Sequence, residues 1–301
     1  MSDGFTQICA LLPTALRQSA LSLPGVVRRQ VEELRLRAGQ CPTVVIGLDE
    51  LPLPGAEPVT PALLERTVEV ATRRSAHSAL ERMRQGYFTV QGGHRIGLCG
   101  SVWSEDGQVR NLRRLSSLSI RVARAVVGCG AEVLPQLLRD GKFVSTLLLS
   151  PPGGGKTTLL RDLVRLLSGG EGAPAVRVGL ADERGEVAAL WEGVPQLDVG
   201  PRTDVMEGCA KAEAMMMLLR GMNPQVLCCD EITRPQDCAA LEQCAGCGVR
   251  LLASVHAGEV DELWQKPLYR SLLERNIFAR AVVLRRPGGW RYAVEELPCC
   301  G

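Results

Sequence analysis

A glycine-rich loop between a short apolar run and a helical pattern is the feature that most constrains this chain. The apolar run covers residues 143–149, and the loop that follows contains three successive glycines at 153–155. Leucine and valine then recur at three- and four-residue spacing over residues 159–167, which predicts an amphipathic helix. A strand, a glycine-rich turn and a helix in this order form the context of a phosphate-binding loop.

The residue types in the loop suit phosphate groups and Mg²⁺. Glycine lets successive backbone N–H groups turn inward around an anion, and the start of a helix adds a positive dipole end. We expect Lys156 to reach the β- and γ-phosphates of a nucleotide and Thr157 to ligate Mg²⁺. Ser150 stands where the usual pattern opens with glycine, and serine fits that turn if its φ is negative. The predicted nucleotide-binding residues of the loop are Pro152, Gly153, Gly154, Gly155, Lys156, Thr157 and Thr158.

Length and charge limit the class of protein. The chain has 301 residues, a length that suits two domains, and its net charge of +2 does not favour a strong nucleic-acid binder. No apolar run approaches the ~20 residues of a membrane span. The first residues lack the basic start and apolar stretch of a signal peptide. We therefore expect a cytoplasmic protein without a transmembrane segment.

Twelve cysteines are many for a protein of a reducing compartment. Cys244 and Cys247 have the spacing of zinc ligands, and residues 299–300 offer two more thiols. However, residues 238–244 have a helical pattern, and a second spaced pair of cysteines is missing from the sequence. Packing within and beside a helix is therefore the favoured interpretation, with a zinc site as the alternative.

The first 120 residues predict a small α+β domain. Residues 31–37 alternate apolar and charged side chains, and residues 43–46 are β-branched and apolar, so together they predict a hairpin. The domain boundary is expected near residues 118–126, which gives domains at 1–120 and 121–301. The other expected elements are a helix over 5–20 interrupted at Pro13, a loop over 49–59, a helix from 60 to about 84, and strands at 87–90, 95–98, 101–103 and 115–122, with a turn at 106–107.

Strands and helices alternate in the second predicted domain. Such alternation predicts a mainly parallel sheet with helices on both faces. After a short helix at 131–139 we expect strands at 143–149, 175–181, 225–230 and 249–255, helices at 211–220 and 237–246, and an edge hairpin formed by 279–286 and 290–296.

Acidic pairs follow two of these strands, at the sheet edge where ligands of such folds bind. Asp230 and Glu231 end an apolar strand, which is the Walker B arrangement: Asp230 is predicted to hold Mg²⁺ and Glu231 to polarise the attacking water. Asp182 and Glu183 end another strand and are predicted to contribute to the same site. The sequence leaves open whether Glu231 or Glu183 is the main catalytic carboxylate.

A histidine and several arginines complete the candidate set. His256 ends a third apolar strand, where a γ-phosphate sensor is favoured over a histidine of the core. Arg121 and Arg124 lie at the predicted domain junction, and Arg121 is expected to bind nucleotide. Further arginines flank the candidate site segments: Arg184, Arg202, Arg220 and Arg234. Action of one or two of these arginines on a neighbouring subunit's nucleotide is one hypothesis, and a surface or structural role is the alternative for each. Three methionines at 215–217 indicate core or subunit-interface packing rather than a metal site.

The chain resembles the stage III sporulation protein AA family, sporulation ATPases related to those of type II and type IV secretion and pilus systems. The matching stretches are residues 33–39, 92–97, 119–124, the glycine-rich loop, 182–184, 202–205, 211–217, 230–231 and 254–256. The resemblance implies a RecA-like P-loop ATPase domain behind a smaller α+β domain, with ATP and Mg²⁺ as cofactors. It also implies a ring, expected to be a hexamer, that acts with membrane proteins of a secretion-like sporulation channel. In this family pattern Asp182 and Glu183 correspond to an acidic box and His256 to a histidine box.

Three functions are compatible with these sequence features. The leading hypothesis is an oligomeric Mg²⁺-dependent ATPase that powers a channel assembly. A RecA-like nucleic-acid-dependent translocase is the alternative, although scarce aromatic residues (4%) and the low net charge argue against single-strand binding. A nucleotide-binding scaffold without turnover is the third, and the combination of Lys156, Thr157, Asp230 and Glu231 argues against it.

Overall fold

The protein forms two compact units. The computed structural model describes residues 4–72, 86–105, 108–285 and 291–297. The first unit comprises residues 1–124 and 189–196, and the second comprises residues 125–188 and 197–301. The chain therefore returns once, over eight residues, from the second unit to the first.

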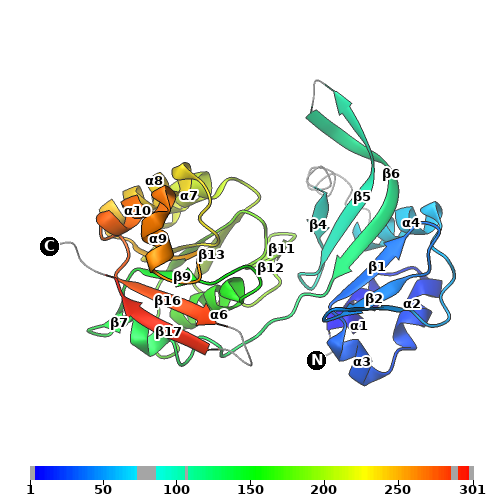
Figure 1. Ribbon diagram of the computed structural model, residues 1–301, viewed down its shortest axis with the longest axis horizontal. Helices are drawn as coiled ribbons and strands as arrows, with labels where there is room; N and C mark the ends of the chain where they lie inside the picture. Colours follow the sequence, from blue (N-terminus) through cyan, green and yellow to red (C-terminus); the bar gives the residue numbers. More distant parts are fainter. Residues whose placement is uncertain (1–3, 73–85, 106–107, 286–290, 298–301) are drawn as a thin grey trace. The chain divides into compact units, whose positions relative to one another are not determined.

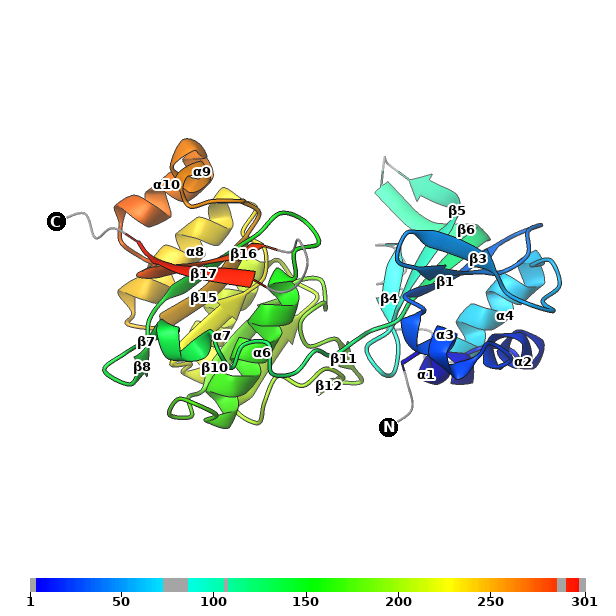
Figure 2. The ribbon, with the colours of Figure 1, turned by 60° about the horizontal axis from the view of Figure 1, so that its bottom comes forward.

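The first unit is a six-stranded antiparallel sheet with helices on one face (Figures 1 and 2). The strand order is β3-β2-β1-β6-β5-β4. The strands are β1 (Glu33–Arg37), β2 (Thr43–Ile46), β3 (Asp49–Pro52), β4 (Tyr87–Thr89), β5 (Arg95–Glu105) and β6 (Gln108–Arg121). The helices are α1 (Gly4–Ala10), α2 (Thr14–Leu21), α3 (Gly25–Gln30) and α4 (Pro61–Thr72).

Alternation of side chains along the strands separates a core face from a polar face. On β1, Leu34 and Leu36 are fully buried in the core that the helices cover, whereas Arg35 and Arg37 point to the other face. On β6, Ile120 is buried in the same way. The polar face therefore collects arginine and serine side chains from neighbouring strands.

Several predictions for the first unit are confirmed and two are wrong. The hairpin of β1 and β2 and the helix break at Pro13 are confirmed. Residues 49–52, expected to be loop, form the edge strand β3; its side chains are all exposed, so burial leaves no pattern in the sequence. The strands expected at 95–98 and 101–103 form one strand, β5, because a bulge at Cys99 and Gly100 keeps the pairing with β6. The helix expected to reach residue 84 is described up to Thr72, and the remainder, with the turn at 106–107, lies outside the described residues.

The second unit is a seven-stranded sheet between two layers of helices (Figures 1 and 2). The strand order is β13-β10-β14-β15-β9-β16-β17, and every neighbouring pair is parallel except β16 and β17. The strands are β9 (Thr146–Leu149), β10 (Val178–Asp182), β13 (Thr203–Glu207), β14 (Val226–Cys229), β15 (Arg250–Val255), β16 (Arg280–Arg285) and β17 (Arg291–Glu296). One face packs on α6 (Lys156–Gly169), and the other packs on α7 (Lys211–Met222), α8 (Pro235–Gly246), α9 (Asp261–Gln265) and α10 (Pro267–Glu274).

The parallel sheet, the helices on both faces and the terminal edge hairpin confirm the sequence prediction. Four strands are buried along their whole length, so they read as continuous apolar runs: β9, β10, β14 and β15 apart from its first residue. The turn between β16 and β17 lies outside the described residues. The helix expected at 131–139 is instead a 3-10 helix, Leu134–Leu137, followed by the two-residue strand β7 (Leu138–Arg139), which pairs with β8 (Lys142–Phe143).

Strand β13 and the small hairpin of β11 (Leu190–Trp191) and β12 (Val194–Pro195) were not predicted. Two-residue strands are too short to leave a periodic pattern, and β13 is only half-buried. None of the described helices is both long and apolar enough to cross a membrane.

Candidate nucleotide-binding site

The glycine-rich loop joins the buried strand β9 to helix α6, as the sequence predicts. Gly153 and Gly155 adopt φ values of 74° and 94°, in the left-handed region that favours glycine. Gly155 directly precedes Lys156, the first residue of α6, and its side-chain-free backbone begins the helix. The loop therefore presents the backbone geometry and the helix N-terminus that a phosphate group requires.

Gly154 is required for a different reason. A Cβ atom at this position would lie 1.6 Å from Ser150 Oγ and 2.9 Å from Ser150 Cβ. Ser150 is fully buried and donates its hydroxyl proton to Pro151 O at 2.8 Å. The serine that replaces the usual first glycine thus occupies the space that a side chain at Gly154 would need, so only glycine fits at residue 154.

Lys156 is buried beneath the loop. Its ammonium group donates to Ser150 O at 2.7 Å and Pro151 O at 3.2 Å, and it lies 2.9 Å from His256 Nδ1. Burial lowers the pKa of Lys156, while the charges of Asp230 and Glu231 act in the opposite direction. The lysine is therefore the cation of the loop and has two carboxylates close to it.

Thr157 and Asp230 meet in the way that a magnesium site needs. Thr157 Oγ1 donates to Asp230 Oδ2 at 2.6 Å, which joins the first turn of α6 to the end of β14. The described residues contain no cluster of three or more metal-ligating side chains. A hydroxyl and a carboxylate are hard oxygen donors, and Mg²⁺ usually keeps several waters and binds few protein ligands beside substrate phosphates. The pair therefore fits Mg²⁺ held together with a nucleotide.

Glu231 and His256 extend this group of contacts. Glu231 Oε1 lies 2.8 Å from His256 Nε2, and Glu231 Oε2 accepts a hydrogen bond of 2.9 Å from the exposed Arg184. The backbone of Glu231 has a φ of 56°, an uncommon conformation for a residue with a side chain. Such backbone positions concentrate at functional sites.

Asp182 organises the loop that follows β10. It is buried, and its carboxylate accepts backbone N–H groups of Glu186, Val187 and Ala188 at 2.8–3.0 Å. Burial raises the pKa of Asp182, and these three hydrogen bonds act in the opposite direction. Direct contact between Asp182 and a nucleotide stays a prediction, since its described partners all belong to its own loop.

Arg161 ties the same loop to the phosphate-loop helix. Its guanidinium group donates to the carbonyl oxygens of Val187 and Glu186, both at 2.6 Å, and only 8% of the residue is exposed. Sequence reasoning missed Arg161, because a single arginine on the inner face of an amphipathic helix has no distinguishing pattern.

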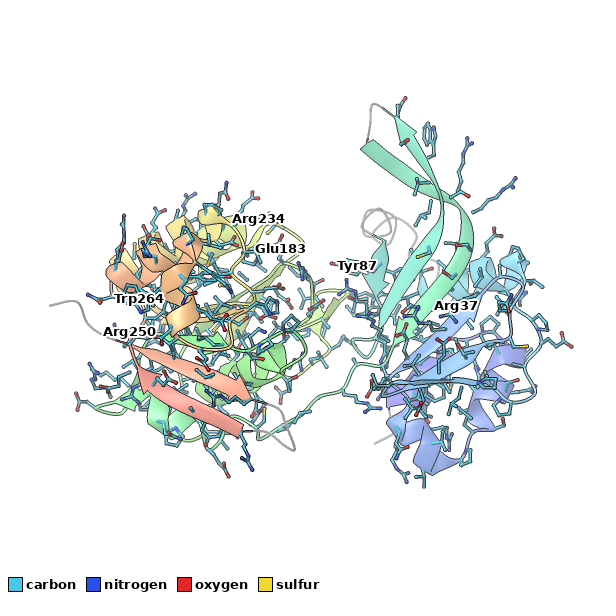
Figure 3. The ribbon with its side chains drawn as sticks, viewed as in Figure 1. Arg37, Tyr87, Glu183, Arg234, Arg250 and Trp264 are labelled. Carbon is cyan, nitrogen blue, oxygen red and sulfur yellow. The ribbon has the colours of Figure 1, made fainter. Side chains whose placement is uncertain are left out.

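Glu183 lies in a separate network of charges. Its carboxylate contacts the buried Lys211 at 2.8 Å and Arg234 at 3.5 Å, and Figure 3 shows Glu183 and Arg234 next to each other. Lys211 also lies 3.6 Å from Asp237, whose carboxylate accepts the backbone N–H groups of Thr233 and Arg234 at the start of α8. Burial acts to raise the pKa of Glu183, but hydrogen bonding to Lys211 holds it below its ordinary value.

The acidic residues at the carboxyl ends of β10 and β14 converge, as expected for neighbouring parallel strands. Asp182, Glu183, Asp230 and Glu231 line one small cavity of about 20 Å³, together with Arg184, Glu186 and Lys211. The structure thus brings together all the predicted carboxylates, whereas Lys211 was not predicted as a site residue.

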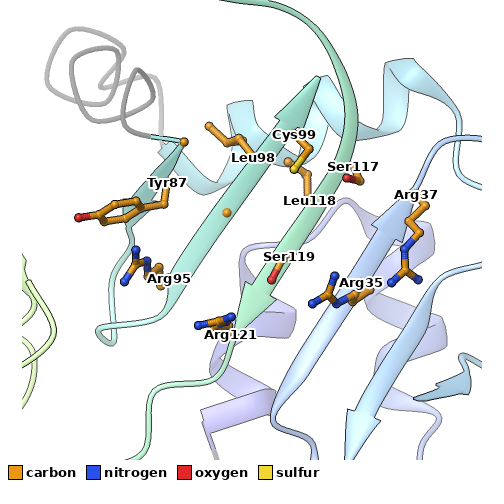
Figure 4. Close-up of a pocket in the computed structure, with 12 residues that line it drawn as sticks. Arg35, Arg37, Tyr87, Arg95, Leu98, Cys99, Ser117, Leu118, Ser119 and Arg121 are labelled. Carbon is orange, nitrogen blue, oxygen red and sulfur yellow. The ribbon is translucent and has the colours of Figure 1, made fainter. Parts of the chain in front are cut away.

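Arg121 lies in the first unit, at the end of β6. It lines a cavity of about 380 Å³ on the polar face of the sheet, and Figure 4 shows it there with Arg95, Arg35 and Arg37. The Arg35 guanidinium contacts Glu33 at 2.8 Å, Arg37 pairs with Glu50, and Arg95 stacks over the ring of Tyr87 at 3.5 Å. The nucleotide-binding role of Arg121 stays a prediction.

The cysteines in the described part of the chain are all free thiols. Cys244 is buried and Cys247 is exposed, at the end of α8. Burial raises the pKa of Cys244 to about 11, which opposes the thiolate form that a zinc ligand needs. Residues 299–300 lie outside the described residues.

Comparison with known sequences identifies a family. A family model described as sporulation stage III, protein AA, matches residues 3–292. Stage III sporulation protein AA of Bacillus subtilis (strain 168) is 36% identical over 287 residues, which cover 94% of this chain and 92% of that protein. The Arabidopsis thaliana protein SEEDLING PLASTID DEVELOPMENT 1 is 28% identical over 182 residues. This match covers 56% of this chain and 26% of the Arabidopsis protein.

Solved structures share the fold. The pilus retraction motor PilT, with bound ADP, aligns with a TM-score of 0.60 at 17% identity, over 91% of this chain and 83% of that one. The Legionella pneumophila ATPase DotB aligns with a TM-score of 0.55 at 12% identity, over 88% of this chain and 75% of that one. At these identities the likeness concerns the fold, and it confirms the predicted RecA-like domain preceded by a smaller α+β domain.

Proposed function

Since the chain belongs to the family of sporulation stage III protein AA, we propose that it is a Mg²⁺-dependent ATPase motor that energises a secretion-like channel assembly during bacterial sporulation. The observation that carries this proposal is the hydrogen bond between Thr157, at the start of α6, and Asp230, directly after β14. It joins the two elements that a nucleotide-bound Mg²⁺ would need, at the same edge of the sheet as Lys156.

Different residues of the chain would bind the phosphates, hold Mg²⁺ and orient water. The backbone N–H groups of residues 153–155 and the start of α6 would bind the phosphates, and Lys156 would exchange its loop carbonyl partners for phosphate oxygens. Thr157 and Asp230 would hold Mg²⁺, which supplies charge neutralisation for the phosphates. A carboxylate is needed to orient or deprotonate water, a contribution of roughly 10²–10⁴-fold.

Glu231 is our first candidate for that carboxylate. It contacts His256, which in turn contacts Lys156, so it is linked to the phosphate loop through one intervening side chain. Glu183 is held instead by Lys211 and Arg234, away from any described contact with the loop. His256 would report the occupancy of the loop to Glu231 through its two ring nitrogens.

We further propose that the active form is a ring of identical chains, expected to be a hexamer, at the cytoplasmic side of membrane partners. The ring, its expected size and the membrane partners rest on the family resemblance. The names of the similar proteins support the motor role: one is a sporulation protein, and the solved neighbours are a pilus retraction motor and an ATPase. Arg121, on the arginine-rich face of the first unit, is the proposed residue that reaches a nucleotide on a neighbouring chain.

Phosphate release from ATP by the purified chain tests the proposal. It is measured with and without Mg²⁺, with and without single-stranded DNA and RNA, while the mass of the particles is recorded. We expect Mg²⁺-dependent release by a ring-sized particle, unchanged by nucleic acid. Release that requires nucleic acid would support the translocase alternative, and absence of phosphate release under all of these conditions would contradict both.

A further inference from the structure

We infer that Ser254 is a positioning residue that holds both acidic residues of the site: it orients Asp230 toward Thr157 and fixes the turn that carries Glu231. The inference rests on the proposed function, because the orientation of Asp230 matters for the binding of Mg²⁺ with a nucleotide. Sequence reasoning gave Ser254 no role, although a hydroxyl in an otherwise apolar strand was visible.

Strand register places Ser254 beside the acidic pair. In the parallel ladder of β14 and β15, Cys229 pairs with Ala253, so the next residues along the two strands are Asp230 and Ser254. Ser254 is completely buried. A buried hydroxyl needs hydrogen-bond partners, and the end of the ladder offers them in the turn after β14.

The hydroxyl of Ser254 has two defined partners. The backbone N–H of Glu231 donates to Ser254 Oγ at 2.8 Å, and Ser254 Oγ donates to Asp230 Oδ1. A serine hydroxyl carries one proton, and the Glu231 N–H can only donate, so that proton is directed to the carboxylate of Asp230.

Each oxygen of the Asp230 carboxylate therefore accepts a hydrogen bond from one hydroxyl group. Thr157 donates to Oδ2 and Ser254 to Oδ1, which prevents rotation of the carboxylate about its last side-chain bond. A carboxylate offers about four lone-pair directions, so two hydroxyl donors leave others for a metal ion or its bound water. Ser254 supports the metal-binding orientation without itself being a ligand.

Ser254 also fixes the unusual backbone of Glu231. The side chain of Ser254 accepts the N–H of Glu231, and the carbonyl oxygen of Ser254 accepts the N–H of Ile232 at 2.9 Å. These bonds bracket Glu231, whose φ is 56°. The turn that aims the Glu231 carboxylate at His256 is thus held by the side chain and the main chain of one residue.

The test measures ATP affinity at a series of Mg²⁺ concentrations and in excess chelator, for wild type, Ser254→Ala and Ser254→Cys. The thiol of cysteine is close in size but a weak donor. In both variants we expect the affinity for ATP in excess chelator to stay at the wild-type value. The Mg²⁺ concentration that gives half of the metal-dependent increase in ATP affinity should rise about 10- to 100-fold, as for other residues that orient a metal ligand. Ser254→Thr, which keeps the hydroxyl, should return this concentration toward wild type.

Ser145→Ala is the matched control. Ser145 is also buried, and its hydroxyl accepts a backbone N–H of the same strand, that of Leu251 at 3.1 Å, at the other end of β15. We expect its removal to leave the Mg²⁺ requirement unchanged. Two results would overturn the inference but not the proposed function. One is an unchanged Mg²⁺ requirement in Ser254→Ala, and the other is an equally large shift in Ser254→Thr or in Ser145→Ala. A wild-type chain that binds no ATP would overturn the proposed function together with the inference.

Discussion

Lys156, His256 and Glu231 form a continuous chain of side-chain contacts from the glycine-rich loop to the end of β14. A lysine ammonium can only donate, so His256 Nδ1 must accept, and the ring proton lies on Nε2, where it donates to Glu231. The tautomer of His256 thus follows from its two neighbours. A phosphate that draws Lys156 away would remove the partner of Nδ1 and change the contact that Glu231 receives.

Replacement of either candidate carboxylate separates their roles. Glu231→Gln should bind ATP with wild-type affinity but hydrolyse it about 10²- to 10⁴-fold more slowly, because the amide cannot accept a proton from water. Glu183→Gln should cause a smaller loss, since Glu183 pairs with Lys211 and Arg234. Single-turnover phosphate release measures both, and normal turnover in Glu231→Gln would assign the catalytic role to Glu183.

The fit between Ser150 and Gly154 makes a second prediction. Gly154→Ala should weaken ATP binding, because the new Cβ would overlap Ser150 Oγ, and such overpacking typically costs about 1–3 kcal/mol. The double variant Ser150→Gly, Gly154→Ala should recover part of the affinity, with Pro151 O still 3.1 Å from the Cβ. Equilibrium titration with ATP measures the effect.

Gly221→Ala serves as the control for that comparison. Gly221 lies in α7, and a Cβ there would meet no heavy atom of the described structure within 4 Å apart from its chain neighbours and the adjacent backbone of the helix. ATP affinity in this variant should equal that of wild type. Equal affinity in Gly154→Ala would show that the loop tolerates a side chain, against the fit described above.

At the scale of elements, His94 joins three segments of the first unit. It is completely buried, its Nδ1 accepts the N–H of Ala123 at 3.0 Å, and its Nε2 lies 3.2 Å from Gln7 Oε1 on α1. Burial lowers the pKa of His94 to about 4. The unfolded chain therefore binds a proton at its ordinary pKa of ~6.5, before the folded chain does.

This difference predicts acid sensitivity of the first unit. Stability that His94 contributes is present above pH ~6.5 and is lost as the pH falls toward 4, by up to roughly 3 kcal/mol. His94→Gln should be less stable at neutral pH but should lose less on acidification. Denaturant unfolding, monitored by hydrogen exchange of the β5 and β6 amides, measures the stability at neutral pH and its loss on acidification. Identical pH dependence in the two proteins would contradict the assignment.

The fully buried strands were predictable from sequence, whereas the exposed or very short strands were not. Strands β9, β10, β14 and β15 are apolar because helices cover both of their faces, so their runs stand out. The edge strand β3 has only exposed side chains, and the hairpin of β11 and β12 has two residues per strand. Backbone pairing alone defines these elements, and it has no residue signature.

The residues of the candidate site also fall into those that the sequence predicted and those that it did not. Residues in recognisable sequence patterns, such as Lys156, Thr157, Asp230 and His256, were predicted, and the structure brings them into contact. Ser254, Arg161 and Lys211 were missed, because their importance comes from partners distant in the sequence. The sequence resemblance to the sporulation stage III protein AA family is confirmed by the match over residues 3–292.

For the whole molecule, the chain crosses between its two units more than once. Residues 189–196 belong to the first unit although they follow β10 of the second, and within that unit Gln196 Oε1 accepts the N–H of Gly92 at 2.9 Å. The same eight residues follow directly after the loop that Asp182 and Arg161 organise. The acidic loop of the second unit is therefore continuous in sequence with a piece of the first unit.

The most direct test of the proposed motor compares wild type with Lys156→Ala in ATP binding and Mg²⁺-dependent phosphate release. Lys142→Ala, which removes an exposed lysine on β8, is the control for the loss of one positive charge. We predict that wild type and Lys142→Ala bind ATP and release phosphate at equal rates, and that Lys156→Ala does neither. Wild-type binding and turnover in Lys156→Ala would contradict the assignment of the glycine-rich loop as the nucleotide site.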